Sequence, residues 1–353
     1  MQERVAALVI GAALSESQIA TSSSAEMKAD VDALVRTAPL LTATWIKQTP
    51  PPVREVKAVV RHGRAVAPLL LALLPDADVN DASRWRVQQQ ATLALSAIYV
   101  VSPHCGRVYC DGDDPQRLAR IKQSWVRTVT EDQELRALPT SELVARFKNE
   151  PIFWRQFEVA QALAASGDRS AIGVLEGLLT VEDRHVRGNA AFVLGRLGDP
   201  RGFATIAESL DDRSPRSAGQ GIATGRWTLD AQIRADRYYA AHLLGDLQDS
   251  RGVDVLIPLL ADRDAGSVVP WALARIGDRR AIEPLVKALE RDEPSSRVLA
   301  IGALETLEAR EALPVLERLL QDTRRSNFGE LTTVADAARR AIAVISNDAA
   351  RLR

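Results

Sequence analysis

The chain has 353 residues, of which 46% are hydrophobic, 5% aromatic and 26% charged, and its formal net charge is −1. Alanine and leucine dominate the apolar residues, a mixture that favours closely packed helices over sheets, which prefer β-branched and aromatic residues. The balanced charge gives no reason to expect a nucleic acid or an anionic membrane as partner, and no apolar run is long enough to predict a membrane span.

The first predicted segment, residues 1–54, contains the apolar stretch VAALVIGAAL at residues 5–14, which has two interpretations. Its length, with the small residues Ser23 and Ala25 behind it, fits a signal peptide covering about residues 1–25. The single arginine ahead of it is cancelled by a glutamate, and the same stretch also fits an amphipathic helix. The balance favours a cytoplasmic protein over an exported one.

Residues 55–130 are predicted to be divergent helical repeats. The stretches 63–74 (GRAVAPLLLALL) and 85–99 (WRVQQQATLALSAIY) have the apolar patterns of a first and a second repeat helix. The stretch 102–115 (SPHCGRVYCDGDDP) is rich in proline, glycine and aspartate, which predicts a loop. Another helix is expected at 116–129.

The loop carries both cysteines of the chain, Cys105 and Cys110. Such a close pair is compatible with a disulfide in an exported protein and with free thiols in the cytosol. His104 precedes the pair, but a structural zinc site needs four ligands, usually with CxxC spacing. We therefore expect no metal here, and we expect no cofactor elsewhere in the chain.

Residues 131–346 repeat a unit of two helices, and residues 347–353 form a tail. The turn that closes each second helix recurs at 167–168, 198–199, 248–249, 277–278 and 308–309, so the spacings are 31, 50, 29 and 31 residues. Aspartate at such a turn can cap the next helix, and glycine can end the previous one in a left-handed conformation.

A single unit of this kind cannot bury its apolar face, so neighbouring units must stack. The sequence therefore predicts an all-α fold, a right-handed α-solenoid (a superhelix) of antiparallel helix pairs of the HEAT-like or armadillo-like kind. The units at 186–199 (VRGNAAFVLGRLGD) and 278–289 (DRRAIEPLVKAL) resemble the HEAT-like repeats of phycobilisome lyases. This resemblance covers residues 168–345 and implies, by analogy, a chromophore lyase or a lyase subunit.

Two insertions interrupt the period between the two helices of a unit, at 214–230 and at 323–331. The first contains three glycines, but it lacks the preceding strand of a dinucleotide site and the lysine of a P-loop. Arg216, Arg226 and Trp227 are residue types that anchor interfaces, so we expect them to bind a partner.

The second helices carry several basic and aromatic residues on one face. The candidates for a concave binding surface are Arg187, Arg234, Arg237, Tyr238, Trp271, Arg275 and Arg297. These arginines either form salt bridges between units or line a stripe that binds an acidic peptide or a nucleic acid. His185 and His242 are interpreted as surface or groove residues of the same helices.

Motifs of catalysis are missing from the sequence. There is no GxSxG or HExxH motif, and no histidine is followed by glutamate, as in the iron-binding HEAT-like deoxyhypusine hydroxylases. The leading prediction is therefore a non-catalytic scaffold, not an enzyme, that binds a protein partner. The alternative is a chromophore-lyase-like enzyme or subunit, and a nucleic-acid-binding groove ranks below both.

Overall fold

The computed structural model describes residues 23–38, 54–74, 82–99, 115–214, 228–327 and 333–346. In these ranges all regular structure is helical, apart from one isolated antiparallel bridge between Arg325 and Thr333. The predicted all-α fold of stacked helix pairs is confirmed. No helix of the described ranges is both long and apolar enough to cross a membrane.

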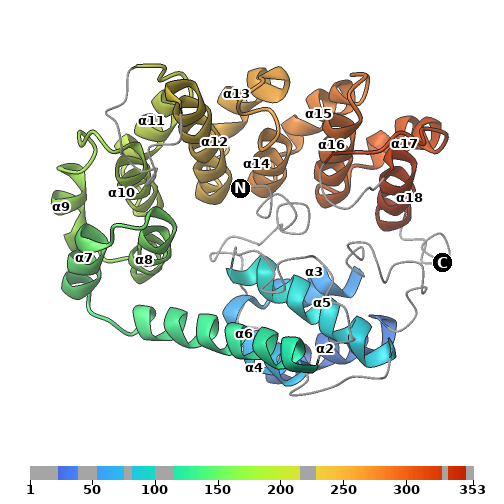
Figure 1. Ribbon diagram of the computed structural model, residues 1–353, viewed down its shortest axis with the longest axis horizontal. Helices are drawn as coiled ribbons and strands as arrows, with labels where there is room; N and C mark the ends of the chain where they lie inside the picture. The colour runs from blue at the N-terminus through green and yellow to red at the C-terminus, as the bar shows by residue number, and fades with distance from the viewer. Residues whose placement is uncertain are drawn as a thin grey trace. The chain divides into compact units, whose positions relative to one another are not determined.

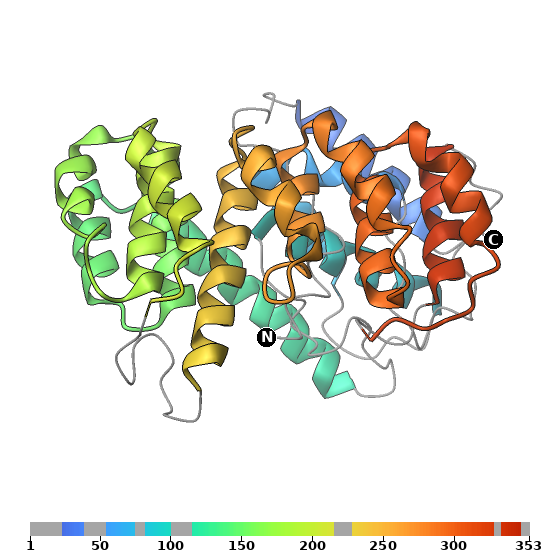
Figure 2. The same ribbon diagram turned by 90° about the horizontal axis from the view of Figure 1, so that it is seen from above.

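The chain forms two compact units, one made of Thr130–Asp278 and the other of Met1–Val129 with Arg279–Arg353. The helices of the Thr130–Asp278 unit, coloured green to orange in Figure 1, are α7 (Thr140–Asn149), α8 (Phe153–Ser166), α9 (Ile172–Glu176), α10 (Arg184–Arg196), α11 (Pro200–Ser209), α12 (Leu229–Leu247), α13 (Gly252–Leu256) and α14 (Val269–Ile276). The second helices α8, α10, α12 and α14 pack side by side in chain order, an arrangement that Figure 2 shows from above.

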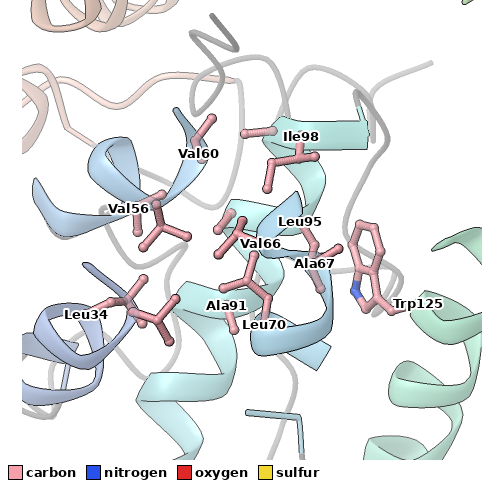
Figure 3. Packing of buried hydrophobic residues seen from close by; sticks show 14 of the residues in the cluster. Leu34, Val56, Val60, Val66, Ala67, Leu70, Ala91, Leu95, Ile98 and Trp125 are labelled. Carbon is pink, nitrogen blue, oxygen red and sulfur yellow. The ribbon is translucent and has the colours of Figure 1, made fainter. Parts of the chain in front are cut away.

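The other unit combines helices from both ends of the chain. From the N-terminal part come α2 (Ser24–Thr37), α3 (Arg54–Val60), α4 (Ala67–Ala72), α5 (Ala82–Tyr99) and α6 (Pro115–Arg136), which runs on into the Thr130–Asp278 unit. From the C-terminal part come α15 (Ile282–Ala288), α16 (Pro294–Thr306), α17 (Leu313–Leu319) and α18 (Val334–Ile345). The N-terminal helices share a core in which Leu34, Val56, Leu70 and Trp125 meet (Figure 3).

The five turns found in the sequence share one backbone conformation. The residue that ends each second helix has a positive φ: 65° at Gly167, 80° at Gly198, 57° at Gln248, 78° at Gly277 and 50° at Glu308. In three of these turns the next residue is an aspartate that caps the following helix. Asp168, Asp199 and Asp249 accept hydrogen bonds from backbone N–H groups at 2.9, 3.0 and 2.9 Å. The turn residues therefore set where each repeat begins.

Small residues let the two helices of a repeat approach each other closely. A Cβ atom added to Gly202 of α11 would lie 2.2 Å from the backbone nitrogen of Gly195 and 2.3 Å from the carbonyl oxygen of Ala191, both in α10. Real Cβ atoms do not come so close to backbone, so this position requires glycine.

The insertion predicted at 214–230 ends earlier than expected. Thr228 caps α12, and Leu229 is already the first residue of that helix.

Candidate functional site

The arginines that recur on the second helices have a structural role in three repeats. The Nε atoms of Arg187, Arg237 and Arg297 each donate to a carbonyl at the end of the preceding segment, at 3.1, 2.5 and 2.7 Å. Because the same contact recurs, these residues tie each second helix to the turn or loop before it. This favours the salt-bridge interpretation of the arginines over a free basic stripe.

Two of these arginines also reach acidic residues of the next repeat. Arg237, whose side chain is 2% exposed, lies 2.9 Å from Asp262 and 2.8 Å from Asp264. Arg297 lies 2.6 Å from Asp322. Burial favours a higher pKa for Asp262, but the hydrogen bond and charge of Arg237 outweigh it and lower that pKa to about 2.

A different cluster joins α12 to α14. Asp246 of α12 is 3% exposed and lies between two basic groups: its Oδ1 accepts from Nε of Arg275 at 3.0 Å, and its Oδ2 is 3.0 Å from Nδ1 of His242. Burial acts to raise the pKa of Asp246, but the charges of His242 and Arg275 hold it below its ordinary value. The carboxylate is therefore ionised, accepts a hydrogen bond from Arg275 and lies close to the imidazole of His242.

The imidazole of His242 packs near two aromatic rings. It stacks on Trp271 of α14 with 4.4 Å between ring centroids, and the ring of Tyr239 is 6.4 Å away in a nearly parallel orientation. Its Nδ1 faces Asp246, whereas no described residue pairs with its Nε2. The His242 side chain is 13% exposed, so an edge of the ring reaches solvent. Such a histidine is both rigid and chemically available.

The row of rings continues through the earlier repeats. His185 of α10 lies 5.2 Å from Tyr239 and stacks on Phe153 of α8 at 4.2 Å. The prediction that His185 is a surface or groove residue is wrong, because only 4% of it is exposed. Burial lowers the pKa of its imidazole, and the nearby Asp236 and Asp183 offset this only in part. His185 is therefore a buried residue that packs among these rings.

Buried amide side chains hold these aromatic rings in place through hydrogen bonds. The hydroxyl of Tyr239 donates to Oδ1 of Asn189, and Nδ2 of Asn189 donates to Oε1 of Gln156 at 2.9 Å. Gln156 in turn donates to the carbonyl of Phe147 at 2.9 Å. The chain of bonds runs from α12 through α10 and α8 to α7, so the rings are held by a satisfied polar network.

The outer side of α12 carries Arg234, Tyr238 and His242 at intervals of four residues, which places them on one face of the helix. The Arg234 side chain is 41% exposed and pairs with Asp230, one turn earlier. We call the following group the α12–α14 face: Arg234, Tyr238, His242 and Asp246 of α12 with Trp271 and Arg275 of α14. A water-sized pocket lies beside His185, Asp236 and Tyr239.

The structure unites some of the predicted site residues and separates others. Arg234, Tyr238, Trp271 and Arg275 belong to the α12–α14 face, whereas Arg187, Arg237 and Arg297 bond to backbone carbonyls. The remaining predicted residues lie outside the described ranges: Arg216, Arg226, Trp227, Cys105 and Cys110. In the described part of the chain no three His, Cys, Asp or Glu side chains are grouped to hold a metal ion.

The sequence analysis did not single out Asp246, and it interpreted His242 only as a surface or groove residue. A signal was present: His242 and Trp271 are 29 residues apart, as are Asp246 and Arg275, and 29 is the repeat spacing at this point. Residues one repeat apart occupy equivalent places on neighbouring second helices. Comparing equivalent positions would therefore have placed the two contacts side by side.

The HEAT-repeat family model matches residues 140–223 and 267–328, which covers most of the turns described above. These two stretches of the chain are HEAT repeats. Three curated proteins are similar to part of the chain. The bilin biosynthesis proteins PecE of Mastigocladus laminosus and of Nostoc sp. are 37% and 34% identical over 154 and 155 residues, and the alpha subunit of phycocyanobilin lyase of Picosynechococcus sp. is 34% identical over 113 residues.

These alignments cover 43%, 43% and 27% of the chain and 51%, 55% and 42% of the relatives. The chain thus spans about half the length of the curated relatives it matches. Their names overturn the prediction of a non-catalytic scaffold that is not an enzyme, because they point to bilin biosynthesis and to a lyase. A search for contiguous motifs does not detect a site whose residues come from different repeats.

Proposed function

We propose that this HEAT-repeat protein is a subunit of a bilin lyase, with a bilin as its substrate and another protein subunit as its partner. The observation that carries the proposal is the 37% identity to a bilin biosynthesis protein over 154 residues. A second relative is named as one subunit of a phycocyanobilin lyase, which supports a protein partner. The predicted protein partner thus takes a more specific form, that of a second lyase subunit.

The α12–α14 face has the chemistry that a bilin requires. A bilin is a linear conjugated tetrapyrrole with propionate side chains, so it needs aromatic contacts along its length and a cation for its carboxylates. Trp271, His242 and Tyr238 supply ring edges, and the half-exposed Arg234 supplies a guanidinium. The pair of Arg234 with Asp230 is at the surface, where such pairs are weak, so a propionate can replace the aspartate.

The test is an absorbance titration of the purified full-length chain with phycocyanobilin. We expect a saturable change in the visible spectrum, because conjugated rings respond to the shape and polarity of their surroundings. Arg234→Ala should weaken binding about tenfold, or ~1.4 kcal/mol, through the lost charge–propionate contact. Arg279→Ala is the matched control, because Arg279 is also exposed and paired with a carboxylate, that of Glu311, but in the other unit.

The control variant should bind phycocyanobilin as the unaltered chain does. Identical spectra with and without protein, for phycocyanobilin and for several other bilins, would contradict the proposed function. Equal weakening by both arginine variants would instead place the bilin away from the α12–α14 face.

A further inference from the structure

His242 has a geometry that packing alone does not require. Its Nδ1 lies 3.0 Å from Oδ2 of Asp246, its ring stacks on Trp271 with 4.4 Å between centroids, and its Nε2 has no partner among the described residues. A histidine with one nitrogen on a buried carboxylate and the other open is arranged to give or accept a proton. The charged and titratable groups packed around it are Asp246, Tyr238 and Tyr239 of α12 and Arg275 of α14.

Arg275 completes this arrangement from the neighbouring repeat. It occupies Oδ1 of Asp246, so that only Oδ2 is left for His242. The carboxylate therefore cannot turn away, and the imidazole keeps Nε2 directed away from Asp246. A chain that needed only a stable helix contact could place an apolar side chain here, because replacing buried ion pairs by apolar groups is often neutral or stabilising.

We propose that His242 is the proton-exchanging residue of the bilin site and acts on the bound chromophore through Nε2. The inference rests on the proposed function. In the forward step the Nε2–H bond of the imidazolium breaks, its electron pair stays on Nε2, and a new N–H bond forms at a basic ring nitrogen of the bilin. The positive charge moves to the chromophore, and the reverse step restores both partners. The transfer needs no oxidant or reductant.

The experiment measures the absorbance of phycocyanobilin bound to the full-length chain as a function of pH. Protonation changes the visible band of a bilin, so the midpoint reports the proton affinity of the bound chromophore. His242→Gln keeps a polar side chain of similar size that does not titrate, and should shift the midpoint by about one pH unit or more, a tenfold change in proton affinity. Its affinity for phycocyanobilin should change far less.

The matched control is His62→Gln in the other unit. His62 is also buried and also contacts an aspartate, with its Nε2 2.7 Å from Asp30. His62→Gln also removes a contact between a histidine and an aspartate. Because this contact is not part of the α12–α14 face, the variant should leave the midpoint of the absorbance titration unchanged. A His242→Gln complex that binds phycocyanobilin and titrates like the unaltered chain would overturn the inference but not the proposed function. Absence of any bilin binding by the unaltered chain would overturn both.

A second measurement does not depend on whether the variant folds. Diethylpyrocarbonate modifies accessible imidazole nitrogens, and mass spectrometry assigns the modification among the four histidines of the chain. We expect His242 to react in the free chain, and we expect phycocyanobilin to protect it. The buried His185 should react slowly in both states. Equal modification of His242 with and without bound phycocyanobilin would contradict contact between Nε2 and the chromophore.

Discussion

Arg234 and Arg237 lie one turn apart on α12 but have different surroundings. The Arg237 side chain is 2% exposed and bonds to the carbonyl of Leu210 and to two aspartates, whereas the Arg234 side chain is 41% exposed with one surface partner. The sequence grouped both as binding residues, because spacing alone does not show which side of a helix meets the next repeat. Burial separates the residue that holds the fold from the one that is free to meet a ligand.

This difference predicts how the two arginines contribute to stability. Arg237→Ala would leave Asp262 and Asp264 without their buried partner, so the free energy of unfolding should fall by about 3 kcal/mol or more. Arg234→Ala removes only a surface pair and should cost less than about 0.5 kcal/mol. Denaturant unfolding followed by circular dichroism measures both values. Similar losses for the two variants would contradict the structural role given to Arg237.

At the scale of the helix, the turns are the part of the fold that the sequence predicted best. Their glycines and capping aspartates act through local backbone geometry, so these turns can be recognised from the local sequence alone. The sequence also predicted helices at 85–99 and 116–129, and the structure has α5 at Ala82–Tyr99 and α6 at Pro115–Arg136. Even Gln248 and Glu308, which are not glycines, adopt the left-handed conformation.

The candidate site was harder to predict, because its contacts join different repeats. Whether His242 faces solvent or a carboxylate depends on how α12 packs on α14, and a contact 29 residues away is invisible to a local motif. The aromatic contacts also join different repeats, since Phe153, His185 and Tyr239 come from three helices. Repeat alignment recovers such pairs only when equivalent positions are compared across units.

Glycines at two kinds of position allow a direct test of the turns. Gly277 ends α14 with φ of 78°, a conformation that strains residues with a Cβ, so Gly277→Ala should lower the free energy of unfolding by about 1–2 kcal/mol. Gly173 lies inside α9, and a Cβ there meets nothing within 4 Å. Gly173→Ala should therefore raise stability by about 0.5–1 kcal/mol. Opposite signs in thermal or denaturant unfolding are expected, and a gain for Gly277→Ala would contradict the left-handed turn.

At the scale of the whole molecule, a solenoid gains its stability mainly from contacts between neighbouring repeats. Most hydrogen bonds and ion pairs of the α12–α14 face therefore depend on the adjacent helices α10 to α14, and all of them lie in the Thr130–Asp278 unit. A defect in one repeat should weaken its neighbours first. It should leave the distant repeats α15 to α18 in the other unit less affected.

Gly202→Ala tests this locality, because the added Cβ would meet the backbone of α10 at 2.2 Å and force α10 and α11 apart. Hydrogen exchange followed by mass spectrometry should show faster exchange in α10, α11 and α12, with protection of α16 and α18 close to that of the unaltered chain. The same variant should weaken phycocyanobilin binding, since α12 carries much of the proposed site. Uniform loss of protection along the whole chain would mean that the chain unfolds as one cooperative block, and that the separation into two units has no energetic counterpart.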